Sequence, residues 1–398
     1  MDAPPGRGGA RRRIAPPEVL ASGVPATGRM RAAYAAAGVD VDAGERAVEL
    51  MRARVAATHG PDVIEGIGGF GAAVALPAGY RDPVLVSSTD GVGTKTRIAG
   101  SLRRFDTIGQ DLVAMCADDV VCLGARPLFF LDYVAVGRIQ PAEVADLVGG
   151  VARGCELAGC ALVGGETAEH PGLMDPDEFD LAGFCVGIAE RDELLDGKAA
   201  VAGDALVGIA STGLHSNGYS LVRALITERG LDLRAPYLEI VRRVLGDAEA
   251  ARVGTHEPSH VMAALGDVLL TPTRIYALDV LALRAALETR GVPVRGLAHI
   301  TGGGLHGNVP RALPEHLAAN VAVGSWPVPS VFRLVAALGG LDGPELRAIL
   351  NAGIGMVMVV PDHGAGPAIE ALAERGLDAW RIGSVEPVDR AGTRYMEH

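Results

Sequence analysis

The amino-acid sequence predicts a two-domain protein of the α/β class, in which strands and helices alternate along the chain. The chain has 398 residues, of which 49% are hydrophobic, so it is long enough to bury two cores. Apolar segments of strand length alternate with segments of helical periodicity, and many of the joins are short and glycine-rich. A polar linker before residue 200 divides this pattern. We therefore expect an N-terminal domain over residues 29–200 and a C-terminal domain over residues 201–398.

Composition excludes several classes of protein. Residues 1–28 are rich in Pro, Gly and Arg without apolar periodicity, so we expect a disordered tail there. The net charge of −12 argues against a nucleic-acid binder, and the apolar runs are too short for a membrane span. Five cysteines without a C-x-x-C pair or a signal peptide fit the reducing cytoplasm.

Two glycine-dense turns, Gly66–Gly71 and Gly91–Gly93, are separated by apolar segments of strand character. The second turn follows an expected strand and places Asp90, Thr94 and Lys95 within six residues. Glycine leaves no Cβ between backbone N–H groups and an anion, a carboxylate can hold Mg²⁺, and an ammonium can neutralise phosphate oxygens. The combination suits a nucleoside triphosphate, although neither turn fits the Walker pattern G-x-x-x-x-G-K-[ST].

Lysine usage singles out one residue beside the second turn. The chain has 36 Lys and Arg residues, and only Lys95 and Lys198 are lysine. Because the chain uses arginine almost exclusively as its basic residue, a position that keeps lysine is more readily explained by a chemical requirement for lysine. Lys198 lies in a plain turn and is expected to be a surface residue, whereas we expect Lys95 to be functional.

An acidic helix is predicted over residues 106–123. Asp111 and Asp118 lie seven residues apart and share a face, and Asp119 is rotated by roughly 100° from Asp118. Helical acids usually form a solvated stripe. Asp118 and Asp119 are instead bracketed by AMCA and VVCLGA, a poor setting for free carboxylates, so a metal ion or a basic partner is expected beside them.

The other elements follow from periodicity and turn signals. Strands are expected over 84–88, 128–136, 160–163, 180–189, 205–211, 296–300, 353–360 and 379–385, and helices over 43–58, 141–158, 272–290, 331–338, 345–350 and 366–375. The strand over 160–163 is followed by GGETAEH, which places Glu166 at a strand end.

Two turns of the second half are candidate binding loops. In TGLHSNGYS, Ser216 or Asn217 could cap the following helix, and His215 is either a satisfied surface histidine or a substrate contact. Gly302-x-Gly304-x-x-Gly307 matches the dinucleotide fingerprint. No Asp or Glu lies between Glu315 and Asp342, so the expected ribose-binding acid is missing.

Nine collinear motifs resemble one family closely. They are TDGVGTK, DTIGQDLVAMCADD, PLFFLDYVAVG, LVGGETAE, AGFCVGI, LHSNGYSLVR, LTPTRIY, ITGGGLHGNVPR and NAGIGM. The family is phosphoribosylformylglycinamidine cyclo-ligase, or AIR synthetase, and the resemblance runs from about Tyr34 to Gly383. It implies an N-terminal mixed sheet with helices that pairs with its twin into a dimeric β-barrel. It also implies a C-terminal α/β domain covering the active cleft.

The resemblance also implies a reaction and its residues. ATP and formylglycinamidine ribonucleotide would give aminoimidazole ribonucleotide, ADP and phosphate in the cytoplasm. Asp90, Asp119 and Glu166 would hold Mg²⁺, with K⁺ as a further candidate cation, and Lys95, Asp90 and His215 would be catalytic. The ATP-binding set would be Gly68, Gly69, Phe70, Gly71, Gly91, Gly93, Thr94 and Lys95, and the substrate-binding set His215, Ser216, Asn217, Gly302, Gly303 and Gly304.

Alternatives from other classes have less support. A NAD-dependent oxidoreductase rests only on the glycine fingerprints, and a non-catalytic nucleotide sensor would keep the glycine loops but not the substrate cleft. Selenophosphate synthetase is disfavoured because no cysteine precedes Cys116. The sequence departs from the family at Asp118, which is often Asn, at LHGN after Gly304, and at Ala352, where Cys or Met is common.

Overall fold

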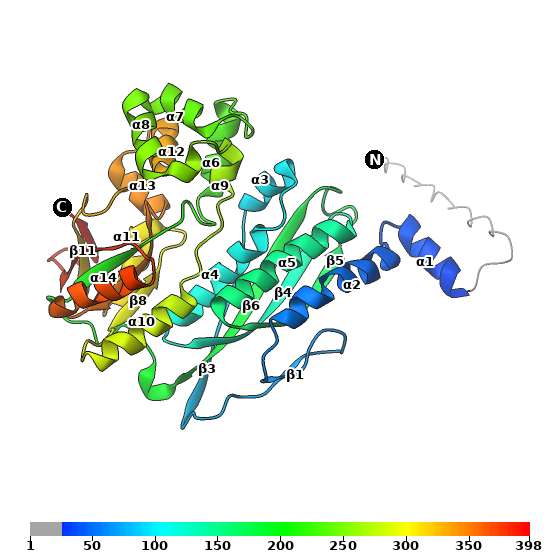
Figure 1. The fold of residues 1–398 in the computed structure, drawn as a ribbon, viewed down its shortest axis with the longest axis horizontal. Helices are drawn as coiled ribbons and strands as arrows, with labels where there is room; N and C mark the ends of the chain where they lie inside the picture. The colour runs from blue at the N-terminus through cyan, green and yellow to red at the C-terminus, as the bar shows by residue number, and fades with distance from the viewer. Residues whose placement is uncertain (1–25) are drawn as a thin grey trace, which may run out of the picture.

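A computed structural model of the chain describes residues 26–398 (Figure 1). The predicted tail lies outside this range except for residues 26–28, which belong to helix α1 (Ala26–Ala36). Two sheets organise the rest of the chain, one formed by residues 83–190 and the other by residues 205–397. Over the described residues, none of the helices combines the length and the hydropathy needed to cross a bilayer.

The N-terminal domain contains a mixed four-stranded sheet, as predicted. Its strand order is β3-β6-β4-β5, and only the β4–β5 pair is parallel. Helices α4 and α5 cover one face, α2 packs against α5, and the hairpin β1–β2 carries the first glycine turn near β5. The elements are α2 (Val41–Ala57), β1 (Val63–Glu65), β2 (Ala73–Val74), β3 (Pro83–Gly91), α3 (Lys95–Leu102), α4 (Ile108–Cys122), β4 (Arg126–Val136), α5 (Pro141–Ala158), β5 (Ala161–Glu169) and β6 (Phe179–Glu190).

Two strands are longer than predicted, and this moves two candidate carboxylates. β3 continues to Gly91, so Asp90 pairs with Gly183 of β6 instead of lying in the turn. β5 continues through Gly164 and Gly165 because both pair with β4, so Glu166 lies inside a strand instead of at its end. Glycine signals suggested a stop at both places, but neighbouring strands supply the backbone partners that keep the chain extended.

The face of this sheet opposite α4 and α5 is partly exposed and apolar. Leu85, Tyr133 and Phe184 lie on three adjacent strands and are 59%, 40% and 39% exposed. An antiparallel sheet normally alternates buried apolar and exposed polar side chains, so aromatic residues on the open face are unusual.

The C-terminal domain contains a six-stranded sheet of order β12-β9-β11-β7-β10-β8. The β12–β9 pair is parallel and the others are antiparallel. The strands are β7 (Ala205–Ala210), β8 (Gly296–His299), β9 (Leu317–Val321), β10 (Ile354–Val360), β11 (Ala379–Pro387) and β12 (Tyr395–Glu397). The helices are α6 (Tyr219–Glu228), α7 (Tyr237–Leu245), α8 (Asp247–His256), α9 (Leu265–Leu269), α10 (Ala277–Thr289), α11 (Gly304–Asn308), α12 (Ser330–Gly339), α13 (Gly343–Ile349) and α14 (Ala365–Glu374).

The two domains meet along α4, which packs on the N-terminal sheet and also contacts β8 and α10. One cluster of buried apolar residues runs through both domains. The predicted helix over 272–290 begins only at Ala277, and residues 271–276 cross the junction without helix or strand structure. The prediction of a side-chain cap at Ser216 or Asn217 was also wrong, because α6 begins after Gly218 at a φ of 76° without a side-chain cap.

Candidate active site

A cavity of about 260 Å³ lies between the domains. Its walls come from β3, α4 and β8 and from the residues that follow α11. Asp119 of α4 and His299 of β8 meet in its wall, where the distance from Asp119 Oδ1 to His299 Nδ1 is 3.0 Å. This contact joins the two domains at the wall of the cavity, so the cavity is an interdomain cleft.

His299 is the histidine that the sequence reasoning missed. Burial lowers its pKa, but the hydrogen bond to Asp119 and the charges of Asp118, Asp119 and Asp90 outweigh burial, so the net pKa is raised. Its Nε2 atom is buried and has no partner among the described residues. The only signal in the sequence was its position directly before ITGGG, at the end of an expected strand.

Asp90 lies at the end of β3 and is exposed. Its Oδ1 accepts a hydrogen bond of 2.7 Å from the backbone N–H of Gly91. Partial burial raises the pKa of Asp90, the hydrogen bond from Gly91 opposes this, and the charge of Asp119 raises the pKa further. Asp90 and Asp119 therefore act on each other electrostatically at the edge of the cleft.

Asp118 and Asp119 have different surroundings although they are adjacent. Asp118 is fully buried, and its Oδ1 accepts a 2.9 Å hydrogen bond from the backbone N–H of Tyr276. Burial raises the pKa of Asp118 to about 7. The side chain of Asp119 is 39% exposed and faces the cleft. Adjacent helical positions point about 100° apart, which explains how α4 serves the junction with one acid and the cleft with the next.

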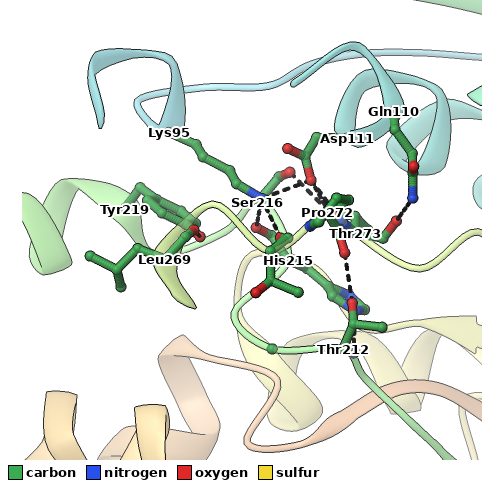
Figure 2. A network of polar contacts seen from close by, with 12 residues as sticks. Lys95, Gln110, Asp111, Thr212, His215, Ser216, Tyr219, Leu269, Pro272 and Thr273 are labelled. Atoms are coloured by element: carbon green, nitrogen blue, oxygen red, sulfur yellow. Dashed lines mark hydrogen bonds and ion pairs between the residues drawn. The ribbon is translucent and has the colours of Figure 1, made fainter. Parts of the chain in front are cut away.

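Lys95 is fully buried at the domain junction (Figure 2). Its Nζ donates to Asp111 Oδ1 at 2.8 Å, to the carbonyl oxygen of Thr271 at 2.8 Å and to that of His215 at 3.0 Å. Burial lowers the pKa of Lys95, and the charge and hydrogen bond of Asp111 oppose this. An ammonium has three donors, so none remains for a phosphate oxygen in this conformation.

His215, Ser216 and Asn217 lie at the same junction. His215 is buried, which excludes the alternative of a surface histidine, and its φ of 62° is uncommon for a residue with a side chain. His215 Nε2 accepts from the backbone N–H of Thr212 at 3.2 Å, and its Nδ1 is buried without a partner among the described residues. Burial lowers the pKa of His215, as do the charges of His299, Lys95 and Arg274.

The glycine loop of the predicted substrate site begins one residue after Ile300. Gly302 and Gly303 are exposed, and Gly303 and Gly304 have φ values of 90° and 57°. The Nδ2 atom of Asn308 donates to the carbonyl oxygens of Gly302 at 3.1 Å and Gly304 at 2.9 Å, which fixes the loop. A Cβ at Gly302 would lie 3.5 Å from Asn217 Oδ1, so the structure brings two predicted substrate residues together.

The two glycine turns of the predicted ATP site lie at opposite edges of the N-terminal sheet. Gly91–Gly93 lie at the end of edge strand β3, whereas Gly66–Gly71 line a cavity of about 630 Å³ beside the other edge strand, β5. Phe70 is fully exposed in this loop. Glu166 lines the β5 cavity, three strand spacings or about 14 Å from the β3 edge. Within one chain, Glu166 and Asp90 therefore cannot hold the same ion.

Asp132 of β4 is a further candidate that the sequence reasoning did not single out. It lines the cavity beside Gly66–Gly71, and its Oδ2 is buried without a partner among the described residues. Burial raises the pKa of Asp132 to about 7. Gly165 leaves room for it, because a Cβ there would lie 1.8 Å from Asp132 Oδ1.

The donor sets suit a cation only in part. Residues 26–398 contain no group of three or more His, Cys, Asp or Glu side chains placed to hold a metal ion. Asp119 lines the cleft and Asp90 lies near it at the end of β3, and Mg²⁺ commonly binds proteins through one or two carboxylates with phosphate and water completing its shell. The cleft pair therefore fits a magnesium ion that arrives with a nucleotide.

Comparison with known families covers most of the chain. A family model described as "AIR synthase related protein, N-terminal domain" matches residues 71–189, and its C-terminal counterpart matches residues 201–395. The chain is 49% identical over 362 residues to the phosphoribosylformylglycinamidine cyclo-ligase of Gloeobacter violaceus, covering 91% of this chain and 99% of that protein. It is 48% identical over 357 residues to the corresponding protein of Geobacillus kaustophilus, covering 89% and 96%.

Solved structures share the fold at low sequence identity. Thiamine-monophosphate kinase from Stenotrophomonas maltophilia matches with a TM-score of 0.59 and 20% identity, covering 88% of this chain and 95% of that one. Hydrogenase maturation protein HypE in complex with ATP matches with a TM-score of 0.55 and 21% identity, covering 87% and 88%. These likenesses support the two-domain α/β architecture.

Proposed function

The chain belongs to the phosphoribosylformylglycinamidine cyclo-ligase family, and we propose that its interdomain cleft is where the imidazole ring of the product is closed. The enzyme converts formylglycinamidine ribonucleotide into aminoimidazole ribonucleotide. Membership of this family also removes the oxidoreductase alternative. The observation that carries the proposal is the Asp119–His299 pair, which joins the two domains in the wall of the cleft, beside Asp90.

The chemistry explains why ATP is needed. A formamide carbon resists attack by an amine because its oxygen leaves poorly. The formamide oxygen attacks the γ-phosphorus, and the bond to ADP breaks. The amidine nitrogen then attacks the activated carbon, the C–O bond breaks with release of phosphate, and the nitrogen loses a proton. Positioning and charge neutralisation supply most of such catalysis.

His299 is proposed to hold a proton close to the reacting atoms. Its Nδ1 is engaged by Asp119, and its Nε2 points to no protein partner among the described residues. The raised pKa favours a protonated ring that can donate from Nε2 to an oxygen that gains charge. Asp119 orients this ring, as a carboxylate commonly does for a catalytic histidine.

Asp90 and Asp119 are proposed to hold Mg²⁺ together with ATP. The ion would neutralise charge on the phosphate oxygens during transfer. Gly91, Gly93 and Thr94 adjoin Asp90 and are proposed to approach the phosphates, with Gly93 at a φ of 70°. Gly68–Gly71 and Glu166 are proposed as a second nucleotide or cation contact beside Asp132, and K⁺ stays a further candidate.

Lys95, His215, Ser216 and Asn217 are proposed to support the reaction from the domain junction. His215 is neutral by virtue of its lowered pKa, and Asn217 lies beside Gly302. Together with Gly302, Gly303 and Gly304, these residues form the wall against which the ribonucleotide would bind. Lys95 contributes by holding the backbone at His215 and at Thr271 through its hydrogen bonds to their carbonyl oxygens.

We propose a homodimer through the open face of the N-terminal sheet. The support is the row of apolar side chains at Leu85, Tyr133 and Phe184, which a second copy would bury. Within one chain, the two glycine turns lie at opposite edges of the N-terminal sheet. A nucleotide that contacts both kinds of turn would therefore bind between two chains. We place the protein in the cytoplasm, because a reducing compartment suits its five free cysteines.

The test of the proposed reaction is substrate-dependent turnover. ADP release is measured with Mg²⁺ and ATP, with and without formylglycinamidine ribonucleotide, and aminoimidazole ribonucleotide is quantified in parallel. We expect ADP and product in equal amounts and only with the substrate present. Nucleotide binding without either product would favour the sensor alternative and reject the proposal.

A further inference from the structure

The segment Thr271–Tyr276 crosses between the domains without helix or strand, so its backbone groups depend on side chains for hydrogen bonds (Figure 2). Gln110 Nε2 donates to the carbonyl oxygen of Thr273 at 2.9 Å, and Thr212 Oγ1 donates to that of Pro272 at 2.7 Å. The backbone N–H of Tyr276 donates to Asp118. This crossing segment is therefore held on both sides, mostly by α4.

Asp111 is the centre of this arrangement. Its Oδ1 accepts from Lys95 Nζ at 2.8 Å, from the backbone N–H of Thr273 at 2.7 Å and from Thr273 Oγ1 at 2.6 Å. Lys95 uses its two other donors on the carbonyl oxygens of His215 and Thr271. Each partner of an ion pair inside the N-terminal domain thus binds backbone of the C-terminal domain, and both are fully buried.

The same helix connects this tie to the cleft. Asp111 fixes Thr273, Asp118 fixes Tyr276 one residue before α10, and Asp119 contacts His299 on the next strand of the C-terminal domain. Because α4 is rigid over this length, the register of the first contact determines where the third falls. A slip at Asp111 would move His299 and the His215 loop relative to Asp90.

We propose that Asp111 is a positioning residue for the cyclo-ligase reaction, acting through Lys95 and Thr273 to hold the crossing segment and the His215 loop against α4. The proposal rests on the proposed function for its kinetic part only. In this role Lys95 holds backbone of the C-terminal domain and does not contact ATP. A direct contact with ATP would require the ammonium of Lys95 to leave its three present acceptors.

Two matched pairs of variants test this in the full-length protein. Asp111→Asn is compared with Asp106→Asn, which removes an exposed acid five residues earlier. Thr273→Val removes one hydrogen bond on Asp111 and keeps the ion pair, while Thr273→Ser keeps the hydroxyl. Amide hydrogen exchange is followed at residues 212–218 and 271–276, and kcat and KM for ATP are measured beside it.

We expect Asp111→Asn and Thr273→Val to speed exchange over 271–276 by about tenfold or more. Asp111→Asn weakens the acceptor of the Thr273 amide, and Thr273→Val removes the hydroxyl contact that holds Thr273 against Asp111. We expect kcat to fall by about tenfold or more with a change of less than about threefold in the KM for ATP. Thr273→Ser and Asp106→Asn should resemble the wild type in both readouts.

A Lys95→Met variant separates the tie from an ATP contact. If Lys95 acts through the tie, Asp111→Asn combined with Lys95→Met should cost little more than Lys95→Met alone. Additive losses, with a raised KM for ATP and unchanged exchange over 271–276, would overturn the proposal. Unchanged exchange in folded Asp111→Asn and Thr273→Val would overturn it as well. Hydrogen exchange needs no turnover, so failure of the cyclo-ligase assay leaves that part of the test intact.

Discussion

The domain junction and the interdomain cleft are both lined by charged residues of α4, yet they differ in whether those residues are open to a ligand. At the junction, Lys95 has a partner for every donor, and Asp111 accepts three hydrogen bonds through one oxygen. At the cleft, Asp119 is partly exposed, and His299 keeps one ring nitrogen without a partner among the described residues. The junction is closed to a ligand because Lys95 and Asp111 are fully buried, whereas Asp119 leaves an accessible carboxylate at the cleft.

This difference separates stability from catalysis. Removing one partner of a buried ion pair leaves an uncompensated charge and costs several kcal/mol of folding free energy. A group that lines the cleft can contribute to the transition state instead, and can change with less harm to the fold. Variants at the two regions should therefore fall into two classes, and each of the following experiments tests that division.

The largest effect is expected from Lys95→Arg. The charge is kept, but a planar guanidinium cannot place three donors as one tetrahedral ammonium does in a closed site. We expect a loss of about 3 kcal/mol or more in unfolding free energy, together with loss of turnover. Urea unfolding and steady-state kinetics measure both. Lys198→Arg, at the only other lysine and on the surface, is the control. Wild-type stability in Lys95→Arg would show that the junction is not rigid.

His299→Gln should lower turnover and leave stability nearly unchanged. The amide can still reach Asp119 but cannot carry a proton, so kcat should fall by about 100-fold. Thermal unfolding should shift by no more than about 2 °C, less than the shift expected for a loss of about 1 kcal/mol. His363→Gln, an exposed histidine, serves as the control. A large loss of stability would place His299 in the same class as Lys95.

Asp132→Asn sharpens the comparison, because Asp132 is buried like Asp111 but has no ion-pair partner. With a folded-state pKa near 7 and an ordinary unfolded value, the native state holds the proton longer. Its ionisation therefore lowers wild-type stability as pH rises from about 4 to about 7, and the loss is complete above that range. Asp132→Asn should lack this slope and be more stable above pH 7 by on the order of 3 kcal/mol.

Denaturant unfolding at several pH values measures this difference. Asp106→Asn, at an exposed position, should keep the wild-type pH profile. Parallel profiles for the wild type and Asp132→Asn would mean that Asp132 carries no shifted pKa. Such profiles would also mean that Asp132, without an ion-pair partner, behaves like the ion-paired Asp111.

The smallest effect on the stability of the single chain is expected from Phe184→Glu, which lies in neither the domain junction nor the interdomain cleft. A charge on the open face of the N-terminal sheet should prevent association while leaving each chain folded. Sedimentation should then show a 40.9 kDa species where the wild type shows twice that mass. Leu173→Glu, at an exposed residue outside the strands, should not alter association. A monomeric wild type would reject the proposed dimer.

Local signals predicted much of the secondary structure. Helix α5 was predicted with the observed bounds, because Pro141 suits a first helical position and Gly159 ends the helix at a φ of 72°. Helix α10 was predicted five residues too early. Its apolar spacing continues back to Pro272, but α4 captures the backbone N–H groups of Thr273 and Tyr276, and nothing local reveals that competition.

The candidate site was only partly predictable for the same reason. Glycine turns and acids could be picked out, and Asp119 lines the cleft whereas Asp118 is buried, but the role of Asp119 as a metal ligand stays a prediction. The sequence could not show that Lys95 would be enclosed or that His299 would meet Asp119, since 180 residues separate that pair. Contacts of that range depend on how the domains dock, which no motif specifies.

The tie on α4 also has a consequence for how the chain is made. Asp111 is joined to Thr273, which lies 162 residues later, and Asp118 to Tyr276, which lies 158 residues later. At a synthesis rate of about 5–20 residues per second, α4 leaves the ribosome roughly 8–30 seconds before the segment that binds these carboxylates. Until then, water must hydrogen-bond the two carboxylates in place of the missing backbone N–H groups. The face of α4 that later packs on the C-terminal domain stays exposed and can bind chaperones. The N-terminal domain therefore cannot finish folding until the C-terminal domain has been synthesised and packs against it.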